Sequence, residues 1–467
     1  MQTMLEISGN SRKITTAAFA FLILVQVLIL FSFYTGLTNI YSSILLACGA
    51  VVFTFLALSN FELLSYLFII SWLLDFDLTS SLRVRVADLL AILLMVSFIL
   101  KALISRGVSV RRTPFDMVIL ILLSIMGLSL FRASNLQSGV INYLRHLELF
   151  SVFAVFCYSM DISHAKRMLR LFIGVVAINS LISVTLYIGQ GGGRVFGIGG
   201  NEFTDMIVPA FIFTNVFFFF ERKPKYRAFL GFLLGLFTFA LFATGTRGAL
   251  FSWGIAVLIA NLILFLHGKV KKRTILKALF AVPALLALLI LVFGFQTSHG
   301  VTSPSQGYVD TIDFRLALWG WAVKAFLSSP LLGIGLNQFM DIEQVFPSAR
   351  INPLFPYLKG LDAHSVVLNF LANTGVIGVG ALFVFFIKIL SVAWNLYKKT
   401  KYLQDAKYTL GLAVVLTYVV YSSFYAGGWF WSLNGFEFMT FLAILVTFSY
   451  KFNHHNANAV VTSQSHN

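Results

Sequence analysis

The chain alternates between long runs of apolar residues and short polar or basic segments along almost its whole length. About 20 consecutive apolar residues make a helix that crosses the hydrocarbon core of a bilayer. We therefore predict twelve to fourteen membrane-spanning helices, the range reflecting the short run at 62–75, which could be re-entrant or merge with its neighbour. The predicted spans are 14–34, 38–58, 62–75, 86–104, 115–132, 141–160, 168–189, 204–221, 227–244, 247–266, 275–295, 375–396, 406–428 and 434–451.

Composition and charge support this interpretation and set the orientation of the chain. Hydrophobic residues make up 58% of the sequence and charged residues only 11%, against about 25% charged residues in soluble domains. The net charge of +16 does not indicate a nucleic-acid partner, because the basic residues cluster in short loops on one side of the predicted spans. We place 24 of the 34 Lys and Arg residues on that side and ten on the other. The positive-inside rule then puts both termini in the cytoplasm.

One long segment and one tail lie outside the predicted spans. Residues 296–374 are predicted to be periplasmic, and a run at 314–327 that ends before Pro330 predicts an amphipathic helix along the membrane interface. Residues 452–467 are polar and predict a disordered cytoplasmic tail. The expected fold is an all-α polytopic membrane protein of 12–14 transmembrane helices, with a single membrane domain over 1–451 and amphipathic helices in its periplasmic segment.

Three arginines on the predicted outer side are candidates for anion binding. Arg247 follows a tight hairpin and opens a span, so its guanidinium would coincide with the positive end of a helix. An equally weighted alternative is a snorkelling anchor that contacts lipid phosphate. Arg194 lies in a Gly-rich segment that can wrap a phosphate or serve as a flexible connector. Arg315 opens the amphipathic run, where it can bind an anion or face solvent.

His364 is the candidate for proton chemistry. It stands where the long outer segment re-enters the membrane, and Asp362 lies close enough in sequence to orient it. The alternative is a polar loop histidine that caps a helix. Paired carboxylates for a metal are missing on the outer side, where Asp310 and Asp313 come nearest to such a pair. No phosphate-binding loop of a nucleotide-dependent enzyme is present either.

Two motifs resemble the O-antigen ligase superfamily of bacterial ligases and polysaccharide polymerases. The first runs Arg315, Trp319, Ser329-Pro330-Leu331-Leu332-Gly333-Ile334-Gly335, Phe339, then His364-Ser365, nine residues, Gly375, two residues and Gly378. Many members have Asn after the His, and Ser365 belongs to the allowed set. The hairpin Thr244-Gly245-Thr246-Arg247-Gly248 is similar to a second signature, which more often has Ser before the Arg. Arg194 with Gly197 also fits a loop of the family, and the resemblance covers roughly 190–380.

The resemblance implies a metal-independent glycosyltransferase without cofactor, active in polysaccharide or lipopolysaccharide biosynthesis at the bacterial inner membrane. Its donor would be a glycan linked to undecaprenyl diphosphate, and its acceptor a glycolipid or glycan at the periplasmic face, surrounded by membrane lipids. The resemblance makes His364 and Arg247 the expected catalytic residues. Arg194, Arg247 and Arg315 become the expected binding residues for the diphosphate.

Two other classes of protein share some of these features. A transporter or flippase of lipid-linked sugars shares the span count and a cationic cavity. Such transporters often contain two related halves, and the sequence has no such symmetry. A structural membrane scaffold would leave both motifs unexplained.

Overall fold

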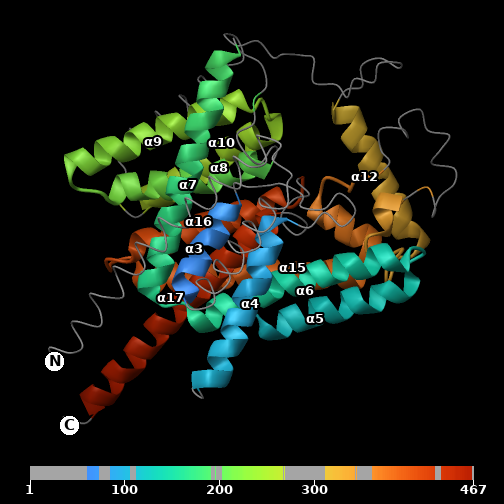
Figure 1. Cartoon of the computed structure of the whole chain (residues 1–467), viewed down its shortest axis with the longest axis horizontal. Helices are drawn as coiled ribbons and strands as arrows, with labels where there is room; N and C mark the ends of the chain where they lie inside the picture. Colours follow the sequence, from blue (N-terminus) through green and yellow to red (C-terminus); the bar gives the residue numbers. More distant parts are fainter. Residues whose placement is uncertain are drawn as a thin grey trace, which may run out of the picture. The chain divides into compact units, whose positions relative to one another are not determined.

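The computed structural model describes residues 60–72, 85–105, 112–190, 195, 202–266, 268, 311–341, 343, 360–425 and 433–464. This part of the chain is helical and contains no β-strand. Figure 1 shows its longer helices. They are α3 (Phe61–Ser71), α4 (Val86–Ser105), α5 (Asp116–Ser129), α6 (Leu136–Ser159), α7 (Ile162–Gly189), α8 (Glu202–Phe220), α9 (Pro224–Ala243), α10 (Arg247–Leu266), α12 (Thr311–Ser328), α15 (Val366–Thr400), α16 (Ala406–Ser422) and α17 (Leu433–Gln464).

The predicted fold class is confirmed. Within the described ranges, seven helices are long and apolar enough to cross a membrane: α6, α7, α8, α9, α10, α15 and α17. The helices α3 and α16 are shorter but also apolar. The predicted spans 14–34, 38–58 and 275–295 lie outside the described residues, so the total of 12–14 spans stays a prediction.

The chain divides into two compact units, which we describe separately. The first comprises residues 1–71 with 77–109, and within it α3 packs against α4. The second comprises residues 72–76 with 110–467 and contains both motifs of the candidate site. Its last helix, α17, continues to Gln464, into the segment 452–467 for which composition predicted a disordered tail.

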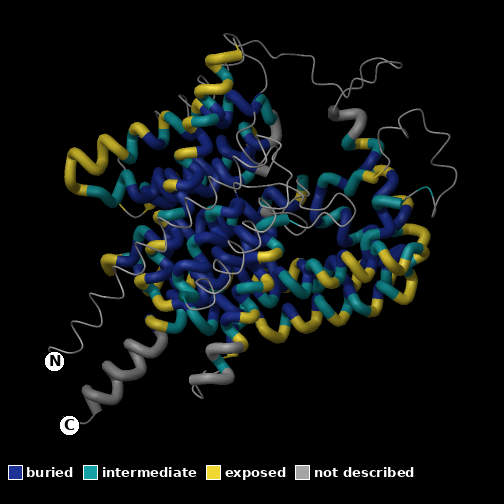
Figure 2. Tube along the Cα trace, viewed as in Figure 1, coloured by how far each residue is buried: buried dark blue, intermediate teal, exposed yellow. Residues whose placement is uncertain are grey.

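Three helices, α8, α16 and α17, form the centre of the second unit. Within the apolar 18-residue stretch of each helix, 83% of α17 and 78% of α8 is buried inside the protein. The corresponding share of α9 is only 28%. Figure 2 shows the same contrast between buried central helices and the exposed face of α9. Aromatic rings pack edge to face across this centre, with Phe441 of α17 5.4 Å from Phe213 and 5.3 Å from Phe172. The exposed apolar faces of the outer helices are suited to contact lipid.

A break inside α15 joins this helix to the segment that follows α12. The predicted span 375–396 omitted the first turns of α15, which begins at Val366 and is interrupted at Gly375 (φ 67°, ψ −165°). The segment 330–335 lies against the interruption and takes up its freed backbone groups. Ile334 N donates to Ala372 O at 2.9 Å, Gly335 N donates to Asn373 O at 3.2 Å, and Val376 N donates to Pro330 O at 2.8 Å. Backbone groups inside a membrane need such partners because no water replaces them.

The close approach of these two backbones explains two glycines of the first motif. A Cβ atom on Gly375 would lie 2.4 Å from the carbonyl carbon of Leu331, and one on Gly333 would lie 2.3 Å from that of Asn373. Both residues also have positive φ angles, 67° and 70°, which favour glycine. These motif positions are therefore structural.

We predict that Gly375→Ala destabilises the protein while Gly380→Ala does not. The first substitution combines an unfavourable φ angle with a backbone clash, which together cost about 2–4 kcal/mol. Gly380 lies in the same helix with no atom within 4 Å of an added Cβ, so alanine there should leave stability within about 1 kcal/mol. Thermal unfolding of both detergent-solubilised variants measures the difference. Equal unfolding midpoints for the two variants would show that the two backbones do not pack tightly at the break in α15.

Candidate active site

Several helix ends meet at one end of the second unit. Here α8, α10, α15 and α17 begin and α16 ends, and we call this region the His364 end. Asn434 Nδ2 of α17 donates to Asp205 Oδ2 of α8 at 2.9 Å, and Val367 N of α15 donates to Ser423 O at 3.2 Å. The hydroxyls of Tyr421 and Tyr425 hydrogen bond to Ser252 of α10. Because helix N-termini carry partial positive charge, four of them together favour an anion at this end.

His364 lies in the turn that enters α15. Its backbone is left-handed (φ 45°), and its N–H donates to Asp362 Oδ1 at 2.8 Å. Ser365 is the N-cap of α15, and its side chain accepts a hydrogen bond from Leu368 N at 3.2 Å. Short polar residues such as Ser and Asn are the preferred N-caps, which gives a physical reason for the residue type that follows the motif histidine. The cap fixes the start of α15 and with it the place of the imidazole.

Helix α12 holds this turn from the other side. The predicted amphipathic run 314–327 is a helix, Thr311–Ser328, and it packs against α15. Trp319 Nε1 donates to Ala363 O at 3.1 Å, and Ala363 is fully buried among Leu318, Ala322 and other apolar residues. Arg315 precedes Trp319 by four residues, so both lie on one face of the helix. This face is directed toward the His364 turn.

Arg315 and His364 are brought close enough to interact electrostatically. Burial is the main cause that lowers the pKa of His364 below its ordinary value of 6.5. The Asp362 carboxylate raises this pKa, and the Arg315 cation lowers it further. The imidazole is 39% exposed, and its Nδ1 lies 3.5 Å from Asp362 Oδ1. These contacts favour a neutral imidazole with its proton on Nδ1 and a basic Nε2.

The structure describes the surroundings of the other two candidate arginines, Arg247 and Arg194, only in part. Arg247 is the first residue of α10, which confirms that it stands at a helix N-terminus. Arg194 lies outside the described residues, but its neighbour Val195 donates its N–H to Ala243 O at the end of α9, at 2.9 Å. The backbone beside Arg194 is thereby tied to the hairpin that carries Arg247. Within the described residues, Arg315 makes no ion pair, which leaves its charge available for an anion.

Two acidic residues beneath this end were missed by the sequence analysis. Asp205 of α8 and Glu437 of α17 lie within electrostatic range of each other, and Asp205 also interacts with Tyr425, as Arg315 does. Glu437 is fully buried, and neither of its carboxylate oxygens accepts a hydrogen bond in the described part of the chain. Both residues interrupt predicted apolar spans, a signal of function that should have been followed. No sequence signal pointed to Ser252 or the two tyrosines.

The acidic, histidine and cysteine side chains of the described residues do not gather into a metal site. No group of three His, Cys, Asp or Glu side chains among them is placed to hold a metal ion. The metal independence of the chemistry stays a prediction.

Comparison with known proteins addresses the resemblance of the two motifs directly. No curated protein matches the chain. A family model described as O-Antigen ligase matches residues 230–383, a range that contains Arg247, Arg315 and His364. The match supports, in general terms, a membrane glycosyltransferase of the ligase or polymerase type. Residues 230–383 are thus similar to the O-antigen ligase family, and the resemblance of the two motifs to the O-antigen ligase superfamily is confirmed.

Proposed function

We propose that the protein transfers a glycan from an undecaprenyl-diphosphate carrier to an acceptor sugar at the periplasmic face of the bacterial inner membrane. The observation that carries the proposal is that the half-buried His364, whose pKa is lowered, lies within electrostatic range of Arg315 where four helix N-termini meet. A proton acceptor beside concentrated positive charge is what this reaction needs. Both groups lie within residues 230–383, which match the O-antigen ligase family model.

His364 acts on the acceptor. The acceptor hydroxyl oxygen attacks the anomeric carbon of the donor sugar while the bond from that carbon to the diphosphate oxygen breaks. Nε2 of His364 takes the hydroxyl proton as charge develops in the transition state, and Asp362 stabilises the imidazolium that results. The products are the lengthened glycan and the carrier diphosphate. Direct attack of this kind inverts the anomeric centre.

The arginines act on the leaving group. Breaking the bond places negative charge on the diphosphate, and fixed cations in a water-poor site offset that charge most effectively. Guanidinium groups bind phosphate oxygens through two parallel hydrogen bonds. Arg194, Arg247 and Arg315 are the proposed clamp, supplemented by the N-terminus of α10. The positive groups suffice for this role, so the mechanism requires no metal ion.

The charge distribution supports the periplasmic assignment of this site. The turns at the opposite end of the same helices, between α8 and α9 and between α15 and α16, carry Arg222, Lys223, Lys401 and Lys407. Basic turns of this kind face the cytoplasm in most membrane proteins. The His364 end then faces the periplasm.

The first test replaces the proposed base while keeping its backbone. His364→Asn suits the left-handed conformation, because Asn tolerates positive φ. We expect transfer to fall by about 100- to 10,000-fold, since the proton acceptor is lost. The measurement is glycan transfer by the purified protein from a carrier-linked donor, with and without EDTA. Activity near wild type in the folded variant, or loss of wild-type activity in EDTA, would contradict the mechanism.

The second test uses the pH dependence of transfer. A base must be unprotonated, so the rate should fall only as pH drops through the lowered pKa of His364. Asp362→Asn removes the charge that raises this pKa, and its amide oxygen can still accept the His364 N–H. We therefore expect the acidic limb of the rate profile to move to lower pH in this variant. A limb that stays in place or moves to higher pH would remove His364 from the role of base.

The third test distinguishes a diphosphate clamp from a lipid anchor at Arg247. Lysine supplies a point charge without the bidentate fork of arginine, but it snorkels as well as arginine does. We expect Arg247→Lys to lose about 2–4 kcal/mol of transition-state stabilisation, or roughly 30- to 1000-fold in rate, and Arg247→Ala to be nearly inactive. Initial rates at matched expression measure this. A lysine variant with the wild-type rate would make Arg247 an interfacial anchor.

A further inference from the structure

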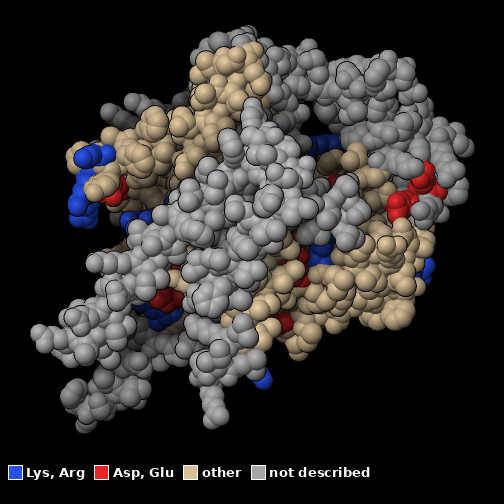
Figure 3. All heavy atoms as spheres, in the orientation of Figure 1, with Lys and Arg blue, Asp and Glu red and all other residues tan. Residues whose placement is uncertain are grey.

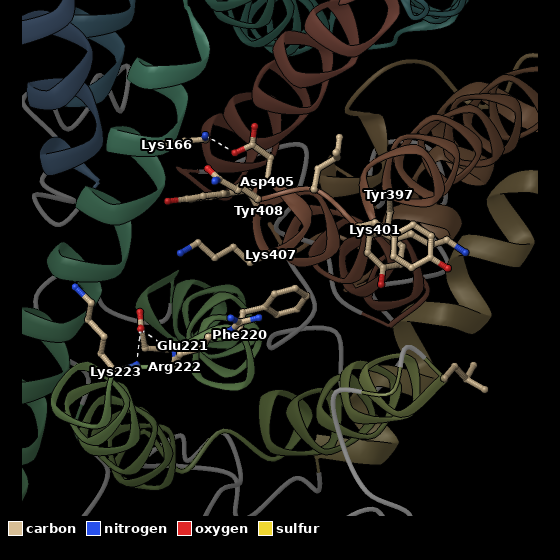
Figure 4. Close-up of a pocket in the computed structure, with 14 residues that line it drawn as sticks. Lys166, Phe220, Glu221, Arg222, Lys223, Tyr397, Lys401, Asp405, Lys407 and Tyr408 are labelled. Atoms are coloured by element: carbon tan, nitrogen blue, oxygen red, sulfur yellow. Dashed lines mark hydrogen bonds and ion pairs between the residues drawn. The ribbon is translucent and has the colours of Figure 1, made fainter. Parts of the chain in front are cut away.

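A polar cavity lies at the opposite end of the helices that form the candidate site. It has a volume of about 1290 Å³ and is lined by the end of α8 and the turn that follows it, the end of α10, the end of α15, the turn between α15 and α16, the start of α16, and Lys166 of α7. Helices α8 and α15 run from the His364 end to this cavity, and α16 runs back. Figure 4 shows the side chains that line it, with Lys166, Asp405, Lys407 and Glu221 along one side of the view. The cavity and the candidate active site are therefore separated by the length of the spanning helices.

Positive charge exceeds negative charge in this cavity. Five basic and two acidic side chains line it. Both carboxylates are already engaged within the protein. Asp405 pairs with Lys166 and with Lys451, the latter at 3.7 Å, and Glu221 accepts the backbone N–H groups of Arg222 and Lys223 at 2.9 Å each.

The remaining four basic residues have no carboxylate bound to them. In the described part of the chain, Arg222, Lys223, Lys401 and Lys407 form no ion pair. Figure 3 shows basic side chains gathered at the turn between α8 and α9. This surplus is enough to bind a ligand with one or two phosphate groups.

Aromatic rings hold the lysines in place around the cavity. The ammonium groups of Lys166 and Lys407 lie 5.3 and 5.4 Å from the centre of the Tyr408 ring, and that of Lys401 lies 4.6 Å from the Tyr402 ring. In the view of Figure 4, Lys407 lies between the Lys166–Asp405 pair and Glu221. The Glu221 pKa is lowered first by its backbone hydrogen bonds and then by the nearby Lys407 and Lys223 cations. Aromatic rings thus position the ammonium groups of three of the lysines that line the cavity.

The rim of the cavity is apolar and exposed. Leu266 at the end of α10 is 69% exposed, Leu403 is 50% exposed and Tyr402 is 88% exposed. The spanning helices end at this level, which is the depth of lipid headgroups. A phosphate attached to acyl chains would contact both the basic residues that line the cavity and its apolar rim. A soluble phosphate would leave the rim in water.

We propose that this cavity binds the phosphate headgroup of an anionic phospholipid, phosphatidylglycerol or cardiolipin, from the leaflet that this end meets. Positive-inside bias alone would scatter basic residues over these turns without enclosing a space. Here the carboxylates are occupied, three of the lysines lie over aromatic rings, and the helices leave a cavity between them. The bound headgroup joins the α8–α9 hairpin to the α15–α16 hairpin, and the inference is independent of the proposed transfer reaction.

The test compares the full chain in nanodiscs of phosphatidylcholine with nanodiscs that also contain phosphatidylglycerol. A ligand that binds only the folded state raises the unfolding midpoint, here by about 2–4 °C for near-saturated binding to a protein of this size. Arg222→Gln with Lys407→Gln should lose this rise. The matched control is Lys225→Gln with Lys398→Gln, two exposed basic residues near the same turns but outside the cavity. The control should keep the rise, although its net charge changes equally.

Any one of four results would overturn the proposal. Equal loss of the rise in both double variants would mean a general surface-charge effect, and an unchanged rise in the cavity variant would place the lipid elsewhere. A full rise with inorganic phosphate alone in detergent would mean a site for a soluble anion. If the cavity variant is already unstable in phosphatidylcholine, Lys401→Gln replaces it. That single variant must then show a smaller rise than Lys398→Gln, and an equal rise would overturn the proposal as well.

Discussion

The arrangement of the candidate site depends on the backbone hydrogen bonds that cross the break in α15. A helix cannot open inside a membrane domain unless other groups satisfy its freed N–H and carbonyl groups. The segment 330–335 meets this need by lying along residues 372–376. The same contact fixes the end of α12 against the first turns of α15, so Arg315 and His364, which are 49 positions apart in sequence, are held at one place.

This constraint separates structural from chemical residues within one motif. Gly333 and Gly375 are needed because two backbones touch there, and Ser365 because a helix must be capped. Only His364 presents a group that can move a proton, and Trp319 supports it by bonding to Ala363. Most residues of this motif therefore shape the backbone contact that positions one reactive side chain, that of His364.

The sequence predicted the elements better than their joints. Apolar runs located α7, α10 and α17 because burial in lipid requires length and apolarity, which local sequence displays. The first turns of α15 were not predicted to be helical because Asn369, Asn373 and Gly375 resemble loop residues, while their partners lie in a distant segment. The closeness of Arg315 to His364 could not be predicted from the sequence for the same reason. Asp205 and Glu437 could have been found as ionisable residues within apolar spans, but their mutual proximity could not.

The proposed anion sites at the two ends of the bundle draw their positive charge from different groups. Topology keeps basic residues scarce on the side predicted to be outside, where ten of 34 lie. An anion site there must concentrate charge in few groups, which favours arginine forks and the N-termini of α8, α10, α15 and α17. The other end has lysines in surplus and can hold them on aromatic rings without drawing on helix ends. Topology also sets the direction of each helix. The four N-termini therefore meet at the end where basic residues are scarce, and the positive charge for an anion must come there from the backbone and from arginine.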